Sequence, residues 1–193
     1  RTNAAASLSM MDLSVEAEAF GSEIRISDDE VPTVIGRILQ TEEDARTLKV
    51  PAITAGRTNL YIDAIKLACR KITDRPVFAG VIGPYSLAGR LMDVSEIMIN
   101  CYEEPDMVHV TLQKVTEFLI GYIKAFQAVG ANGVVMAEPL AGILNPALIE
   151  EFSTPYVKQI VDAVQTDDFI LIYHNCGNNV IILLDSILKT GSA

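Results

Sequence analysis

A histidine and a cysteine stand one residue apart at the end of an apolar run in the last quarter of the chain. The run reads "DFILIYHNCGN", and His174 and Cys176 follow Ile170 and Ile172 in steps of two residues. Side chains two residues apart on a strand point to the same side, and their Cα atoms lie roughly 6.6 Å apart. Imidazole and thiolate both bind zinc, so this spacing permits one metal ion between them.

Spacing alone leaves two other interpretations of this pair open. In one, His174 is a hydrogen-bonded residue at a strand end and Cys176 is a small apolar side chain. In the other, the two form a catalytic dyad. The dyad suits the pattern less well, because a base usually reaches its nucleophile from another element and is oriented by a third group.

Strands and helices that must position the pair alternate along the chain. Apolar runs typical of buried strands occur at 75–84, 132–139 and 168–178, and the longest predicted helix covers 106–130. Strand followed by helix, repeated in this way, is typical of a parallel sheet with crossover helices.

Shorter elements complete the pattern. The composition of 4–21 predicts a helix, and 22–26 alternates as a short strand. Further helices are predicted at 41–50 with Thr41 as the N-cap, 59–72, 145–165 with an interruption at Pro155, and 179–191. From the same patterns we expect Cys69 to face the core, Cys101 to have a structural role and His109 to lie solvated at the surface.

Two parallel architectures compete, an open doubly wound sheet and a (β/α)8 barrel. A dinucleotide-binding open sheet should show a GxGxxG fingerprint after a strand, and the sequence has none, so the barrel is favoured. Such barrels typically take about 250 residues. With 193 residues, no initiator Met and an end at "LKTGSA", we expect a single domain over 1–193 that is a truncated barrel lacking N- and C-terminal portions.

Composition excludes several classes of protein. A net charge of -10 and a pI near 4.6 disfavour nucleic-acid binding. No apolar run approaches the roughly 18 to 20 residues of a membrane span, and the first residues do not resemble a signal peptide. Three widely separated cysteines favour a reducing compartment. We therefore expect a soluble cytoplasmic protein.

Residues at the ends of the predicted strands should share one cleft, because parallel folds gather their working side chains there. Three such ends are Gly83-Pro84-Tyr85, Glu138-Pro139 and His174-Asn175-Cys176. A carboxylate such as Glu138 at the end of an apolar strand must be paired or solvated. It is either part of the site or one half of a salt bridge across the strand ends.

Two longer stretches carry a family resemblance. "GPYSLAGRLMD" and "EEPDMVHVTLQKVTEFLIGYIKAFQAVGANGVVMAEPLAG" resemble the uroporphyrinogen decarboxylase superfamily, and the likeness extends from "MDLSVEAEAFG" over nearly the whole chain. The resemblance implies a (β/α)8 barrel. One branch of this superfamily, the methylcobamide:coenzyme M methyltransferases and related corrinoid-dependent enzymes, binds zinc through an H-x-C pair and a more distant Cys.

A few positions favour the methyltransferase branch. The decarboxylases have no H-x-C at this strand end, and they carry Phe-Asp-Ser where this chain has Ala137-Glu138-Pro139. Arg90 stands where their porphyrinogen-binding tyrosine is expected, and their N-terminal arginine-rich signature is missing. The last difference carries less weight if the chain starts after that signature.

The resemblance implies zinc-dependent transfer of a methyl group from a methyl-corrinoid, either methylcobalamin or a methylated corrinoid protein, to a thiol such as coenzyme M. It assigns His174 and Cys176 as zinc ligands, Glu138 as a catalytic displaceable ligand or charge neighbour, and Tyr85 and Asn175 to the wall of the cofactor cleft. The third ligand is expected beyond residue 193, so this chain should bind metal weakly. A uroporphyrinogen decarboxylase and a non-catalytic corrinoid-binding module are the alternatives.

Overall fold

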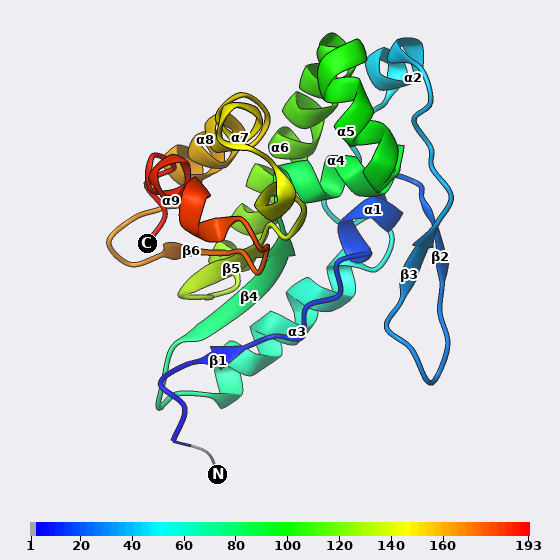
Figure 1. Cartoon of the computed structure of the whole chain (residues 1–193). Coiled ribbons are helices and arrows are strands. Elements are labelled where there is room, and N and C mark those ends of the chain that lie inside the picture. The colour runs from blue at the N-terminus through cyan, green and yellow to red at the C-terminus, as the bar shows by residue number, and fades with distance from the viewer. Residues whose placement is uncertain (1–2) are drawn as a thin grey trace.

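Four parallel strands form the sheet on which the candidate residues lie (Figure 1). The computed structural model describes residues 3–193. The strands run in the order β1 (Ser7–Leu8), β4 (Val77–Ile82), β5 (Gly133–Ala137) and β6 (Ile170–His174), and all their pairings are parallel. All three apolar runs therefore became strands, as predicted.

Helices connect the strands and cover the sheet. The chain between β4 and β5 holds α4 (Pro84–Met92), α5 (Val94–Glu103) and α6 (Pro105–Ala128). Between β5 and β6 it forms η1 (Leu140–Ile143), α7 (Pro146–Phe152) and α8 (Thr154–Val164), and α9 (Val180–Leu188) follows β6. These β–α units are those of a (β/α)8 barrel, and the prediction of a parallel α/β fold is confirmed.

Most of the helices predicted from the sequence are present in the structure. Thr41 caps α2 (Glu42–Thr47) through a capping box with Asp44, and α3 (Thr58–Lys71) follows the predicted amphipathic pattern. The helical region 145–165 is interrupted as expected, but the interruption lies at Ser153, where α7 ends and α8 begins. Pro155 lies within the first turn of α8, where its missing N–H costs nothing.

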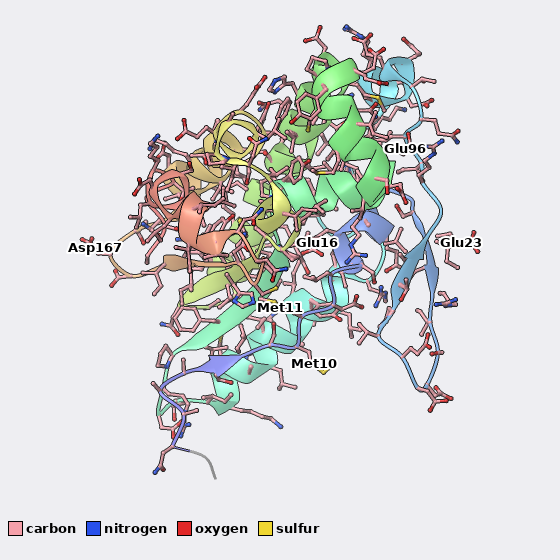
Figure 2. All side chains as sticks on the ribbon, viewed as in Figure 1. Met10, Met11, Glu16, Glu23, Glu96 and Asp167 are labelled. Carbon is pink, nitrogen blue, oxygen red and sulfur yellow. The ribbon has the colours of Figure 1, made fainter. Side chains whose placement is uncertain are left out.

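The predicted helix over 4–21 is wrong for its first half. Ser7 and Leu8 instead pair with Val77 and Phe78 as strand β1, and only α1 (Val15–Ala19) is helical. Pairing with a buried strand outweighs the helix preference of the alanines in this segment, because tertiary contacts readily override intrinsic propensity. Met11 then packs against Gly80 of β4, whereas Met10 is 82% exposed and points away from the sheet (Figure 2).

A small hairpin stands apart from the main sheet. Strands β2 (Glu23–Arg25) and β3 (Thr33–Ile35) pair antiparallel, and Figure 1 shows them on the far side of α1 from β4. The predicted strand at 22–26 is confirmed by β2. The acidic turn 27–30 lies at the exposed tip of the hairpin.

The hydrophobic core lies between the sheet and the helices, and the side chains of Val134, Leu171 and Phe118 are fully buried in it. Cys101 is buried, and Cys69 is partly buried against the core, as the sequence predicts. Within residues 3–193, none of the helices has the length and apolar character that crossing a membrane requires.

The expectation that His109 is solvated surface is correct only in part, because its side chain is 36% exposed but also packs against other helices. Its ring stacks on Phe152 with centroids 4.7 Å apart, and its Nδ1 lies 2.7 Å from the hydroxyl of Tyr156. The three residues join α6 to α7 and α8, so the histidine packs between helices. The acidic residues Glu103, Glu104 and Asp106 precede it in the sequence, and its contact partners lie more than 40 residues away along the chain, so the local pattern does not reveal these contacts.

Candidate functional site

The ends of β5 and β6 lie side by side. Ala137 pairs with His174, and the backbone N–H of Glu138 donates to the carbonyl oxygen of His174 at 2.9 Å. The side-chain amide of Asn175 donates to the carbonyl oxygen of Glu138, also at 2.9 Å. This register places the predicted strand-end residues of both strands at one edge of the sheet.

The carboxylate of Glu138 contacts the start of α4, the helix that follows the neighbouring strand β4. Its Oε2 accepts the backbone N–H of Tyr85 at 3.0 Å, and its Oε1 accepts the backbone N–H of Ser86 at 2.6 Å. Both donors belong to the first turn of α4, where backbone N–H groups have no partner within the helix. A carboxylate suits this position because it also complements the helix dipole.

Gly83 makes this contact possible. A Cβ atom on Gly83 would lie 2.5 Å from the carboxyl carbon of Glu138, closer than real Cβ atoms approach. Pro84 follows as the first residue of α4, a position where proline is favoured. The Gly-Pro pair after β4 therefore ends the strand, starts the helix and leaves room for the acid.

Burial dominates the electrostatics of Glu138. The side chain is 0% exposed, and this loss of solvent raises its pKa to about 7, while the hydrogen bonds from Ser86 and Tyr85 act in the opposite direction. Both forms of the acid are therefore populated near neutral pH.

Asn175 holds the loop after β6. Besides donating to Glu138, it accepts the backbone N–H of Gly177 through Oδ1 at 2.8 Å. Gly142 of η1 presses against this loop so closely that a Cβ there would lie 2.7 Å from the Cα of Gly177 and would overlap Oδ1 of Asn175. The loops after β5 and β6 are thus locked together on either side of Cys176.

Both proposed metal ligands are exposed at this edge. His174 is the last residue of β6, and Cys176 lies two residues further in the locked loop. A thiol and an imidazole are donors of the type that zinc prefers. Within the part of the chain that the structure describes, no third His, Cys, Asp or Glu joins them in a group able to hold a metal ion. The carboxylate of Glu138 is occupied at α4.

Tyr85 contributes to the site through its backbone. Its side chain is fully buried, and its hydroxyl lies 3.3 Å from the sulfur of Met98 and 3.5 Å from that of Cys101. Burial raises the pKa of this phenol far above its ordinary value. The ring therefore packs between α4 and α5, and its N–H binds Glu138.

A second buried acid was not singled out in the sequence. Glu16 of α1 is 2% exposed, lies near the middle of the molecule (Figure 2), and accepts the N–H of Ile82 at 3.1 Å. Burial raises its pKa to about 7. The position of Glu16 between the apolar residues Val15 and Ala17 could have indicated a buried acid. Glutamate is also common on exposed helix faces, so the helix-forming composition of the segment did not draw attention to it.

Glu16 stands beside an ion-pair network. Arg57 binds Asp12 and Glu18, and it also donates to the hydroxyl of Ser14 at 2.9 Å. Although burial acts against it, hydrogen bonds from Ser14 and Arg57 hold the pKa of Asp12 below its ordinary value. The network fixes the segment that connects β1 to α1.

Comparisons with known proteins agree with this architecture. The family model described as "Uroporphyrinogen decarboxylase (URO-D)" matches residues 1–193. The chain is similar to a solved structure described as "methyltransferase from Methanosarcina mazei", with a TM-score of 0.88 and 27% identity. That match covers 97% of this chain and 56% of the other.

Curated relatives come from both branches of the family. Methylcobamide:CoM methyltransferase MtbA of Methanosarcina acetivorans is 31% identical over 186 residues, which are 93% of this chain and 54% of the relative. Uroporphyrinogen decarboxylase of Coxiella burnetii is 29% identical over 166 residues, which are 82% of this chain and 45% of the relative. The chain spans about half the length of the curated relatives that it matches.

The two buried acids should make folding stability depend on pH. Their folded-state pKa of about 7 lies above the ordinary 4.5, so the folded state keeps protons that the unfolded state releases. Their contribution is fully present below pH 4.5 and is lost as the pH rises through 7. Each acid accounts for about 3 kcal/mol at most.

Urea unfolding between pH 5 and 8 measures this loss. Glu16→Gln and Glu138→Gln should each flatten the decline, and Glu117→Gln, at an exposed position of α6, should leave it unchanged. Parallel curves for the wild type and both buried variants would show that neither acid keeps its proton.

Replacing Gly142 by alanine should destabilise the protein by about 1–3 kcal/mol, because the added methyl group meets backbone atoms that cannot move freely. Gly121→Ala is the matched control. Its methyl group would meet only the side chain of Ile53, at 2.7 Å from the flexible Cδ1 end. Urea unfolding of both variants compares them, and an equal loss would contradict the close loop packing described above.

Proposed function

The chain belongs to the uroporphyrinogen decarboxylase (URO-D) family, and from this premise we propose that it is part of an enzyme that transfers a methyl group from a methyl-corrinoid to a thiol. The methyl donor is methylcobalamin or a methylated corrinoid protein, and zinc is the metal cofactor. The observation that carries the proposal is the exposed His174-Asn175-Cys176 loop at the carboxyl end of β6.

Support for methyl transfer over decarboxylation comes from the donors at this loop. Decarboxylation of a porphyrinogen needs basic groups for several carboxylates, and the strand-end loop presents a thiol and an imidazole instead. The similarity to a methylcobamide:CoM methyltransferase covers 93% of the chain, against 82% for a uroporphyrinogen decarboxylase.

In this proposal His174 and Cys176 supply two zinc ligands, and a further ligand comes from outside residues 3–193. Bound zinc would act as a Lewis acid that keeps the acceptor thiol deprotonated at neutral pH. Asn175 orients the ligand loop through its bonds to Glu138 and Gly177. In the same proposal Asn175 belongs to the wall of the cofactor cleft.

Glu138 acts in this proposal as a charge neighbour rather than as a ligand. Its carboxylate is held by α4, while its backbone binds both His174 and Asn175. A group that ionises near pH 7 beside the ligand loop can change its charge by one unit when a thiolate binds. Glu138 is therefore a positioning residue.

The three cysteines are free within the described part of the chain, which suits the reducing environment of the cytoplasm. We place the protein there.

Zinc binding tests the ligand assignment directly. The 193-residue chain, titrated with zinc against a chromogenic chelator, should take up one ion weakly, since it offers two ligands where catalytic sites usually have three. Affinity should rise with pH, because binding displaces protons. His174→Ala and Cys176→Ser should each reduce affinity at least about tenfold, a loss typical of disrupted metal sites. Cys69→Ser, at a partly buried position of α3, is the control.

Enzyme assays distinguish a methyltransferase from a uroporphyrinogen decarboxylase. A longer protein that contains this chain should demethylate methylcobalamin in the presence of 2-mercaptoethanesulfonate, and Cys176→Ser should abolish most of the rate. Release of carbon dioxide from uroporphyrinogen without methyl transfer would assign the chain to the decarboxylase branch. Binding of zinc and methylcobalamin without either reaction would indicate a corrinoid-binding module.

A further inference from the structure

Arg90 is a partly buried cation that pairs with no side chain or carbonyl group of residues 3–193. Among the arginines of residues 3–193, only Arg70 and Arg90 form no hydrogen bond or ion pair with another described residue. Arg70 is exposed to solvent on α3, whereas Arg90 is partly buried near the end of α4. A guanidinium group carries five N–H donors, and its partial burial without an acceptor is unfavourable.

Two hollows meet at this side chain. One, of about 300 Å³, lies between the β1–α1 segment, the start of β3 and Arg90, and its walls include Met11, Leu13 and Pro32. The other, of about 200 Å³, lies between α4, the start of α5 and the loop after β5, and is lined by Ser86, Arg90, Val94, Pro139 and Leu140. The second hollow begins at the residue that follows Glu138, so it adjoins the strand ends.

Arg90 is the only charged residue that lines either hollow within the described part of the chain. The wall of the second hollow is mainly apolar, whereas that of the first is mixed. The hydroxyl groups in both walls already have partners: Ser14 donates to Asp12, Thr33 donates to the carbonyl oxygen of Val31, and Ser86 accepts the N–H of Leu140. Nearby Glu96 is paired with Arg37 at 2.9 Å. A single cation between low-dielectric walls attracts anions more strongly than the same cation in open water.

We propose that Arg90 is an anion-binding residue, and that the two hollows accept a small ligand whose carboxylate, sulfonate or phosphate group pairs with its guanidinium. Such oxyanions match the planar fork of arginine and can accept two parallel N–H bonds from it. The apolar wall of the second hollow then contacts the short uncharged part of the ligand. The site does not depend on methyl transfer, because no zinc, corrinoid or thiol enters the argument.

Binding of anions that lack a thiol tests this site alone. Isothermal titration of the 193-residue chain, in a low-salt buffer without phosphate, compares ethanesulfonate, propionate and inorganic phosphate with neutral propionamide. At least one of the anions should bind saturably, with a dissociation constant on the order of millimolar, and propionamide should not. The anion that binds most tightly identifies the acid group that the site prefers.

Arg90→Gln should weaken that binding about tenfold or more, as loss of a charged hydrogen-bond donor does. Arg90→Lys should bind at an intermediate level, because it keeps the charge without the fork. Arg37→Gln, which removes an arginine paired outside both hollows, should change binding less than about twofold.

Thermal unfolding of each variant accompanies the titrations. Arg90 lies in the last turn of α4, where a cation also stabilises the helix end. A lower unfolding temperature of Arg90→Gln with undiminished anion binding would overturn the proposal and leave a purely structural role. Equal binding of propionamide, or no saturable binding of any anion to the wild type, would also overturn it. None of these outcomes bears on whether His174 and Cys176 bind zinc.

Discussion

The buried side chain of Glu138 is the interaction on which the arrangement of the strand ends depends. Its carboxylate holds the first turn of α4 and so fixes the chain after β4, while its backbone joins the end of β5 to His174 and Asn175 after β6. One residue therefore connects three consecutive strand ends of the parallel sheet. Gly83 is required beside it, because any larger residue would occupy the space of the carboxylate.

Near Glu138, some residues hold the backbone and others are available for chemistry. Glu138 and Asn175 hold the backbone, and close contact between Gly142 and Gly177 restrains the loop, so that His174 and Cys176 are left exposed to solvent. Arg90 adds a positive charge at a hollow that adjoins the same strand ends. A wider hollow of about 550 Å³ lies at the amino ends of β1 and β4, whereas parallel α/β folds place their chemistry at the carboxyl ends.

Strands β4, β5 and β6 could be predicted from the sequence because each is a continuous apolar run, and the strand-end residues followed from them. The need of Glu138 for a partner could also be predicted, since a carboxylate at an apolar strand end is costly alone. Its actual partners, the N–H groups of α4, depend on the register between β4 and β5, which no local pattern contains. Strand β1 was missed for a similar reason, because its partner lies about 70 residues away.

The protonation of Glu138 tests this account most directly. Carbon NMR of the chain with labelled glutamate carboxyl groups follows each acid through a pH titration, and the spectrum of Glu138→Gln identifies the signal of Glu138. A buried carboxyl group that holds the three strand ends should titrate with a midpoint about 7, well above the ordinary 4.5. A midpoint at or below 4.5, together with a free energy of unfolding that Glu138→Gln leaves unchanged, would mean that the side chain is solvated and not held by α4, and would contradict the central role assigned to it.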